Sequence, residues 1–302
     1  MMTEHTLTKL KNFTMEKNNM EYGKLYLCAT PIGNLDDITY RTLETLKMVD
    51  LIACEDTRYS KKLLNHFEIS KPLTSYFEHN KIEKGLVIIE ELKKGKNVAL
   101  ITDAGTPAIS DPGEDLVRQC ADEKIDVVPI PGCVAFVNAL IVSGLPTGRF
   151  TFEGFLSVNR KNRMKHLEDV KDDVRTLIFY EAPHKLLKTL KDMFAYFGNR
   201  KIALVRELTK LHEEVKRTTF EEAIVYYEEN QPKGEFVLVI EGKNEEEIIE
   251  EKSKEYDSIP LAEHVDLLIK DGMDKKSAIK EVAILRNMSK RDVYNLYENE
   301  RD

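Results

Sequence analysis

The stretch Asn97–Gly113, NVALITDAGTPAISDPG, contains the pattern that decides the fold. Its first part, NVALITD, is an apolar run of strand length that continues directly into a loop rich in glycine and proline. Small residues of this kind allow a backbone to approach a ligand closely and to present its N–H groups. The loop Thr102–Gly113 is therefore a candidate ligand site, and a structural turn of a binding module is the alternative.

Strands and helices alternate on both sides of this loop. From Lys24 to Gly144, short apolar runs alternate with segments of helical periodicity, which predicts a parallel sheet with helices on both faces. Two further turns, Pro31–Asn34 and Pro131–Gly132, follow other predicted strands. Because ligands of such sheets bind beyond the carboxyl ends of the strands, we expect the three turns to form one crevice. The first turn lacks G-x-G-x-x-G, and G-x-x-x-x-G-K-[ST] is also missing, which disfavours a hydride transferase or an NTPase.

The fold class predicted is α/β, with a parallel-sheet N-terminal lobe, a mixed-sheet second lobe and a small helical C-terminal tail. The segment Gly144–Gly148 breaks the regular alternation and places the boundary between the lobes. Hairpin-like stretches beyond it predict some antiparallel pairing. The predicted divisions are residues 1–19 (a disordered extension), 20–145 (the N-terminal lobe), 146–243 (the second lobe), 244–258 (an acidic linker) and 259–302 (three short helices).

Composition narrows the function classes only slightly. The chain has 302 residues and a formal net charge of −8, which argues mildly against a strongly basic nucleic-acid binder. No apolar run approaches the ~18 residues of a membrane span, and the first twenty residues lack a signal-peptide pattern, so we expect a cytoplasmic protein without membrane contact. The cysteines form no C-x-x-C pair, which predicts buried, reduced thiols; the scattered histidines predict no metal site.

Seven motifs then occur in a recognisable order: ATPIGNLDDIT, EDTR, TDAGTPAISDPG, IPGCVAF, FYEAPHK, RELTKLHEE and KGEFVLVIEG. Together they resemble the tetrapyrrole-methylase superfamily, which uses S-adenosylmethionine, over roughly Lys24 to Gly242. Within it, the chain is similar to the bacterial subgroup that 2′-O-methylates a cytidine in the decoding centre of 16S ribosomal RNA. The resemblance implies S-adenosylmethionine as cofactor, 16S rRNA within the small ribosomal subunit as partner, and a homodimer.

The resemblance also implies a cofactor site in the cleft between the lobes. The residues that match its contacts from the N-terminal lobe are Pro31, Ala104, Gly105, Thr106, Ile109, Val134 and Ala135. Glu181 and Leu208 match contacts from the second lobe. The chain departs from the superfamily at its first turn, where T-P-I-G-N replaces G-x-G-P-G, and at the central loop, where G-T-P replaces G-D-P. These departures fit the ribosomal-RNA subgroup and put an aspartate contact of the porphyrin-enzyme kind in doubt.

Methyl transfer to a ribose hydroxyl requires alignment of the reacting atoms, and it benefits from a base or from a cation that stabilises the alkoxide. Among the motif residues, Glu181 or Glu207 is a candidate base, and Arg206 and Lys210 are candidate stabilisers. A structural ion-pair network around Arg206 and Glu207 is the alternative interpretation. We expect Asp103 and Asp111 to bond to loop amides.

Two basic regions are candidate RNA contacts. The cluster Asn159–His166 either grips phosphates or forms a solvated helix face, and the tail lysines either contact RNA or belong to a docking or dimer-packing domain. Two other functions remain open at this stage. One is a small-molecule methylase of the corrinoid or sirohaem type, and the other is a non-catalytic ribosome-assembly factor that binds RNA.

Overall fold

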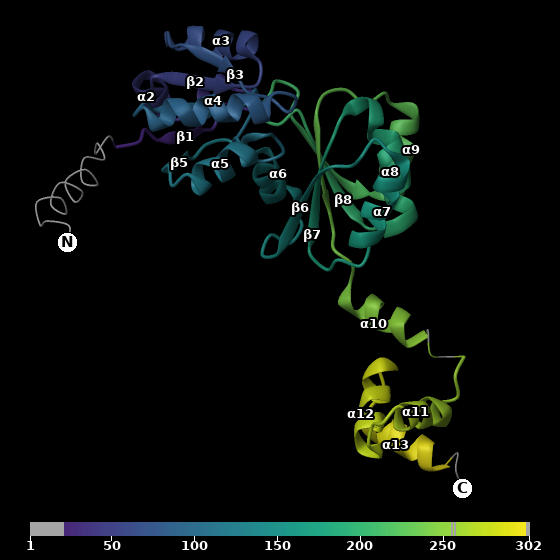
Figure 1. The fold of residues 1–302 in the computed structure, drawn as a ribbon. Coiled ribbons are helices and arrows are strands. Elements are labelled where there is room, and N and C mark those ends of the chain that lie inside the picture. Colours follow the sequence, from purple (N-terminus) through teal and green to yellow (C-terminus); the bar gives the residue numbers. More distant parts are fainter. Residues whose placement is uncertain (1–20, 255, 257, 300–302) are drawn as a thin grey trace, which may run out of the picture. The chain divides into compact units, whose positions relative to one another are not determined.

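A computed structural model describes residues 21–254, 256 and 258–299, and the chain divides into two compact units (Figure 1). The first unit runs to Val137 and includes the segment Glu207–Glu213; the second contains Asn138–Arg206 and the chain from Glu214 onward. The predicted extension, 1–19, lies outside the described residues. The predicted limits at 145 and 243 stay predictions.

The first unit is built on a fully parallel five-stranded sheet in the order β3-β2-β4-β1-β5. Its strands are β1 (Leu25–Cys28), β2 (Leu51–Cys54), β3 (Leu73–Ser75), β4 (Val98–Ile101) and β5 (Val127–Ile130). The predicted parallel sheet is confirmed.

Helices cover both faces of this sheet, as the alternation predicted. One apolar core joins the strands to α4 (Lys81–Lys93) and α5 (Gly113–Asp122), and a second core joins them to α2 (Tyr40–Met48) and α3 (Thr57–His66). A short 3-10 helix, η1 (Leu35–Asp37), follows β1, and α6 (Ala135–Ser143) follows β5. Every strand residue of β4 is buried, which explains the apolar run NVALI.

The second unit contains a mixed sheet in the order β6-β7-β10-β8-β9. Only β6 and β7 are parallel, and the other three pairs are antiparallel, so the predicted antiparallel pairing is confirmed. The strands are β6 (Phe150–Phe155), β7 (Thr176–Glu181), β8 (Lys201–Arg206), β9 (Glu214–Thr219) and β10 (Phe236–Ile240). One core joins β7, β8 and β10 to α7 (Arg160–Val170), α8 (Leu186–Phe197) and α9 (Phe220–Glu229), which lie on the same face in Figure 1. A 3-10 turn, η2 (Pro183–Lys185), precedes α8.

Strand β9 was not predicted from the sequence, which suggested only a short connecting segment up to Thr219. Its sequence, EVKRTT, is polar, and none of its residues is fully buried. It lies at the edge of the sheet and pairs only with β8. An edge strand pairs with a neighbour on one side only, and polar residues along it are common. The alternating hydrophobic pattern from which a strand is predicted is therefore missing.

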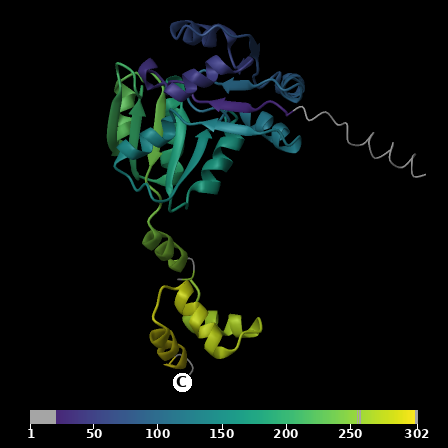
Figure 2. The same ribbon diagram turned by 90° about the vertical axis from the view of Figure 1, so that its left-hand side faces the viewer.

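The C-terminal part is helical. The acidic segment contains α10 (Glu245–Lys254), and the tail contains α11 (Leu261–Lys270), α12 (Lys275–Leu285) and α13 (Lys290–Asn299), which share an apolar core and stand together in Figure 2. Side chains cap the starts of α12 and α13, because Asp274 accepts from the amides of Lys276 (3.0 Å) and Ser277 (3.2 Å), and Ser289 accepts from the amide of Asp292 (3.1 Å).

Three further expectations concern bulk properties. All four cysteines are free thiols, and Cys28, Cys54 and Cys120 are buried, as predicted. In the described part of the chain, no helix has the length and apolarity that crossing a bilayer requires. Over the same residues, no group of three or more histidine, cysteine or acidic side chains is placed to hold a metal ion.

Candidate active site

Three turns at the carboxyl ends of adjacent strands lie together in the first unit. Because β1 lies between β4 and β5, the turns that follow these strands are neighbours. The amide of Thr30 donates to the carbonyl of Gly105 (2.9 Å), and the amide of Gly105 donates to the carbonyl of Thr30 (3.1 Å). The hydroxyl of Thr106 donates to the carbonyl of Cys133 (2.9 Å), which ties the central loop to the turn after β5. The predicted meeting of the three turns is confirmed.

The side chain of Asp111 fixes the shape of the central loop. Its carboxylate accepts from the amides of Ala108 (3.0 Å), Ile109 (3.1 Å) and Gly113 (2.8 Å). A Cβ on Gly113 would lie 2.7 Å from Asp111 Oδ1, so this close contact requires a glycine. Burial raises the pKa of Asp111, and the three amides oppose that shift. The predicted bonding of Asp111 to loop amides is confirmed.

Negative charge gathers beside this loop. Asp103 accepts from the amide of Asp56 (3.3 Å), which lies in the turn after β2, and burial raises the pKa of Asp103. Loss of hydration, together with the charges of Asp103 and Asp111, raises the pKa of Glu55. Among the described residues, no basic side chain forms an ion pair with Asp103 or Glu55. The carboxylates of Asp103 and Glu55 are therefore not held in ion pairs, which leaves them available to a cationic ligand.

A fourth segment, Glu207–Glu213, belongs to the same unit. The amide of Asn34 donates to Thr209 Oγ1 (3.1 Å). A Cβ on Gly33 would lie 2.8 Å from Thr209 Oγ1 and 3.1 Å from the carbonyl oxygen of Leu208, so the segment packs tightly on the turn after β1. We expected Leu208 to be a contact from the second lobe. The loop that carries Leu208 packs within the first unit, and its contact with a cofactor stays a prediction.

Backbone strain concentrates in these two loops. Seven described residues other than glycine have positive φ, and four of them lie in the two loops: Ala108 (69°), Ser110 (62°), Glu207 (50°) and Thr209 (66°). Such conformations cost ~1–3 kcal/mol each and persist where the surrounding structure imposes them, which is common at ligand sites. Their position supports a functional role for both loops.

A cavity of about 270 Å³ opens beside the turn after β1. Its lining combines residues of the predicted site, Pro31 and Asp103, with Tyr59, Lys62 and His66 of α3. The sequence analysis did not single out these three side chains. Their spacing along α3 places them on one face of the helix, which was the available signal, but periodicity alone does not say which face borders a ligand.

Eight of the nine predicted cofactor contacts lie in the first unit. Pro31 and Gly105 are buried, Thr106, Val134, Ala135 and Leu208 are half-buried, and Ala104 and Ile109 are exposed. Gly105 makes its contact with Thr30 through the backbone, whereas Thr106 bonds to the carbonyl of Cys133 through its side-chain hydroxyl. Glu181 is the ninth residue and belongs to the second unit.

Glu181 and Arg206 occupy one row across the second sheet. Phe236 of β10 is paired with Glu181 of β7 on one side and with Arg206 of β8 on the other. Glu181 is buried; its Oε1 accepts from the amide of Ala182 (2.8 Å), and its Oε2 accepts from the hydroxyl of Thr189 (2.5 Å). Both oxygens of this carboxylate are therefore engaged in holding the junction between β7 and α8.

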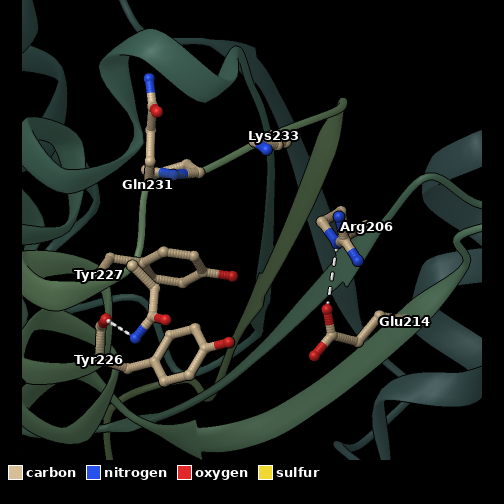
Figure 3. Close-up of a pocket in the computed structure, with 8 residues that line it drawn as sticks. Arg206, Glu214, Tyr226, Tyr227, Gln231 and Lys233 are labelled. Carbon is tan, nitrogen blue, oxygen red and sulfur yellow. Dashed lines mark hydrogen bonds and ion pairs between the residues drawn. The ribbon is translucent and has the colours of Figure 1, made fainter.

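Arg206 forms an ion pair with Glu214 (3.1 Å), and both line a cavity of about 350 Å³ with Tyr226 and Tyr227 (Figure 3). In the first unit, Glu207 pairs with Lys210 (2.9 Å). The ion pairs of the alternative interpretation are thus present, as two separate pairs, one in each unit. Of the four catalytic candidates, Glu207 and Lys210 therefore lie in the first unit, and Glu181 and Arg206 lie in the second.

The basic cluster Asn159–His166 divides between core and surface. Arg163 is buried and bonded to Asp192 (2.8 Å), and His166 contacts Glu153 (2.7 Å). Arg160, Lys161 and Lys165 are exposed. The two alternatives, phosphate contact and a solvated helix face, therefore apply to these three side chains.

Comparison with known proteins settles the family. The sequence model of the tetrapyrrole (corrin/porphyrin) methylases matches residues 24–224. The chain belongs to this family. Two curated relatives bear the name ribosomal RNA small subunit methyltransferase I. The relative from Halalkalibacterium halodurans is 51% identical over 92% of this chain and 96% of its own length; the relative from Bacillus subtilis is 50% identical over 92% and 94%.

Solved structures support the same fold. The crystal structure of a diphthine synthase matches with a TM-score of 0.56 over 74% of this chain and 91% of its own, at 16% identity. At this identity the match concerns the fold alone. The tetrapyrrole methylase fold of the chain, a parallel-sheet unit joined to a mixed-sheet unit, is the one that the sequence predicted.

Proposed function

We propose that this chain transfers a methyl group from S-adenosylmethionine to the ribose 2′-oxygen of a cytidine in the decoding centre of 16S rRNA. The observation that carries the proposal is the 51% identity, over 92% of the chain, to a relative named as a small-subunit ribosomal RNA methyltransferase. The 2′-oxygen and the decoding centre come from the motif resemblance and are the finer part of the proposal.

The first unit has the features that a sulfonium cofactor needs. Ala104 and Gly105 have little or no side chain, and a Cβ on Gly132 would lie 2.6 Å from that of Ala29, so the turns approach one another closely. The carboxylates of Asp103 and Glu55, which are not held in ion pairs, suit a ligand with positive charge. When bound there, S-adenosylmethionine would supply an activated methyl group. Pro31, Ala104–Thr106, Ile109, Val134–Ala135 and Leu208 would hold it.

The chain's own contribution is mainly positioning. A methyl transfer is an in-line displacement, so loops that fix the nucleophile against the donor account for much of the rate. The loops around Ala108 and Glu207, whose positive φ values are imposed by the surrounding structure, would serve as supports of this kind. A ribose hydroxyl also has to lose its proton, and a correctly placed carboxylate assists by ~10²–10⁴-fold.

Of the two candidate bases, we infer that Glu207 acts. Glu181 is buried and both its oxygens already accept hydrogen bonds, whereas Glu207 lies in a loop that packs on the turn after β1. Lys210, 2.9 Å from Glu207, would stabilise the developing charge on the ribose oxygen. Arg206, paired with Glu214, would serve as a phosphate contact.

Labelled cofactor separates this function from the competing ones. Purified protein would be incubated with methyl-labelled S-adenosylmethionine and offered 30S subunits or a precorrin. We expect label in the 16S rRNA of the subunits. Label in the tetrapyrrole alone would establish a small-molecule methylase, and no cofactor binding at millimolar concentration would leave a non-catalytic RNA binder.

The assembled subunit as substrate, the homodimer and the cytoplasmic location are further parts of the proposal. Free 16S rRNA offered beside 30S subunits tests the first, because we expect methylation of the assembled particle only. Light scattering tests the second, with a mass near twice the 34.8 kDa of one chain as the expected result.

A further inference from the structure

A small cavity of the second unit has the properties of an anion site. It lies where the ends of β6 and β7 meet the starts of α7 and α8 and has a volume of about 110 Å³. Pockets for drug-sized ligands begin at ~300 Å³, so this cavity suits a single small group. The polar side chains in its wall are Ser157, Arg163, Glu181, Lys185, Lys188 and Thr189.

Arg163 is a buried cation with one donor group left over. The residue is only 5% exposed, its Nε donates to Asp192 (2.8 Å), and its Nη1 donates to the carbonyls of Ser157 (3.1 Å) and Val158 (3.3 Å). Its Nη2 is buried and has no hydrogen-bond partner in the described part of the chain. An unsatisfied charged donor costs ~1–3 kcal/mol or more, so such groups are retained where a ligand completes them.

The other charged side chains of the cavity also favour an anion. Lys185 and Lys188 form no ion pair with any described residue. The acidic side chain in the wall is Glu181, whose oxygens are engaged by Ala182 and Thr189. The three cations therefore exceed the negative charge of Glu181 and of Asp192 on Arg163.

The backbone of α8 adds to the positive potential of the cavity. Helix α8 begins at the cavity without a side-chain cap, so the positive end of its dipole lies there, although the amide of its first residue, Leu186, already donates to the carbonyl of Pro183. Guanidinium and ammonium groups at a helix start are the combination that binds phosphate oxygens.

We propose that this cavity is a phosphate subsite that holds a backbone phosphate of the RNA substrate. The RNA part rests on the proposed function, whereas the phosphate part rests on the cavity alone. The subsite gives Arg163 the acceptor it lacks, and it uses Lys185 and Lys188 as contacts to a phosphodiester rather than to a base.

The first test uses the full chain and inorganic phosphate. The Nε–H signal of Arg163, identified by its loss in Arg163→Lys, would be followed by NMR during phosphate addition at constant ionic strength. We expect a saturable shift in the wild type and none in the double variant Lys185→Gln/Lys188→Gln. An equal response to chloride and phosphate would overturn the subsite, whatever the function of the chain.

The second test measures binding to 30S subunits as a function of salt. Each phosphate contact contributes ~0.7–0.9 to the slope of log K against log [salt]. We expect the double variant to lose about 0.8 of a unit of slope and roughly sixfold in affinity at 0.1 M salt. Lys191→Gln is the control, since Lys191 lies one turn further along α8 but is paired with Glu228 (2.6 Å).

The outcomes of the two tests are distinguishable. If the wild type does not bind 30S subunits while phosphate shifts Arg163, the proposed RNA function fails and a phosphate site remains. If the wild type binds and methylates the subunits while the double variant behaves like Lys191→Gln, the RNA subsite is wrong and the function stands.

Discussion

At the scale of single residues, Gly105 shows how backbone conformation limits the chemistry of the site. It has φ +86°, exchanges two backbone hydrogen bonds with Thr30, and lies in the loop expected to meet the methionine part of the cofactor. A side chain at this φ is strained, and one branched at Cβ is the most strained.

We therefore expect Gly105→Val to abolish cofactor binding and Gly105→Ala to weaken it. An added side chain would displace the loop and would also occupy space beside it. Asp103→Asn keeps the shape of its side chain and removes a charge, so it should only weaken binding. Calorimetry with S-adenosylmethionine measures all three. Normal affinity in Gly105→Val would mean that the cofactor lies elsewhere.

The two candidate bases have different partners: Glu181 accepts two hydrogen bonds, whereas Glu207 forms an ion pair with Lys210. Substitutions can therefore separate their roles. Glu207→Gln should lower kcat for 30S methylation by ~10²–10⁴-fold with an unchanged cofactor Kd. Glu181→Gln, its matched control, should change kcat less than about tenfold, because an amide at that position can still accept from Ala182 and donate to Thr189. The reverse order of effects would exchange the two roles.

At the scale of elements, the docking of Glu207–Glu213 on the turn after β1 is the contact that local sequence signals did not reveal. The loop RELTKLHEE contains no apolar periodicity, and the residues it meets lie about 175 positions earlier, as in the Asn34–Thr209 hydrogen bond. The three Gly/Pro turns were predictable because each follows an apolar strand whose partners are parallel. The pairing of distant loops requires the folded chain.

Gly33 tests this docking directly. A Cβ there would lie 2.5 Å from Lys210 Cγ and 3.1 Å from the carbonyl of Leu208, so Gly33→Ala should displace the loop. We expect kcat/KM to fall by at least ~10-fold, because misplacements near 1 Å can cost about 10² in rate. Gly148→Ala is the control, since a Cβ at Gly148 meets nothing within 4 Å. Equal activity of the two variants would show that the contact is dispensable.

The tail helices carry a pH-sensitive contact. His264 is buried, stacks on Tyr256 (4.6 Å between ring centroids) and accepts from Arg286 Nε (3.2 Å). Burial, and then the charge of Arg286, lower the pKa of His264. The unfolded chain therefore binds the proton more readily, and the stability of the tail should fall as the pH decreases below about 6.5.

Amide hydrogen exchange of α11–α13 at pH 8 and pH 5.5 measures this effect. After correction for the intrinsic exchange rate at each pH, we expect lower protection factors at pH 5.5 than at pH 8 in the wild type, and a smaller pH dependence of protection in His264→Gln. Protection that does not change with pH in the wild type would contradict the assignment of a neutral, buried imidazole.

At the scale of the whole molecule, the order of strands, turns and motifs predicted the α/β class, the parallel first sheet and the family. The sequence could not divide the catalytic candidates between the units, because Glu207 follows Arg206 directly and yet belongs to the other unit. The sequence also did not decide whether the basic cluster Asn159–His166 contacts phosphates or forms a solvated helix face. Burial assigns Arg163 to the core, where its unpartnered Nη2 becomes the basis of the phosphate subsite.

The most direct measurement is mass mapping of ribose methylation in 16S rRNA from a strain without this protein, repeated after treatment of its 30S subunits with the purified chain and S-adenosylmethionine. We predict that one 2′-O-methylcytidine of the decoding centre is missing in that strain and is restored by the wild-type chain but not by Gly105→Val. An unchanged methylation map in the strain, or restoration by Gly105→Val, would contradict this prediction.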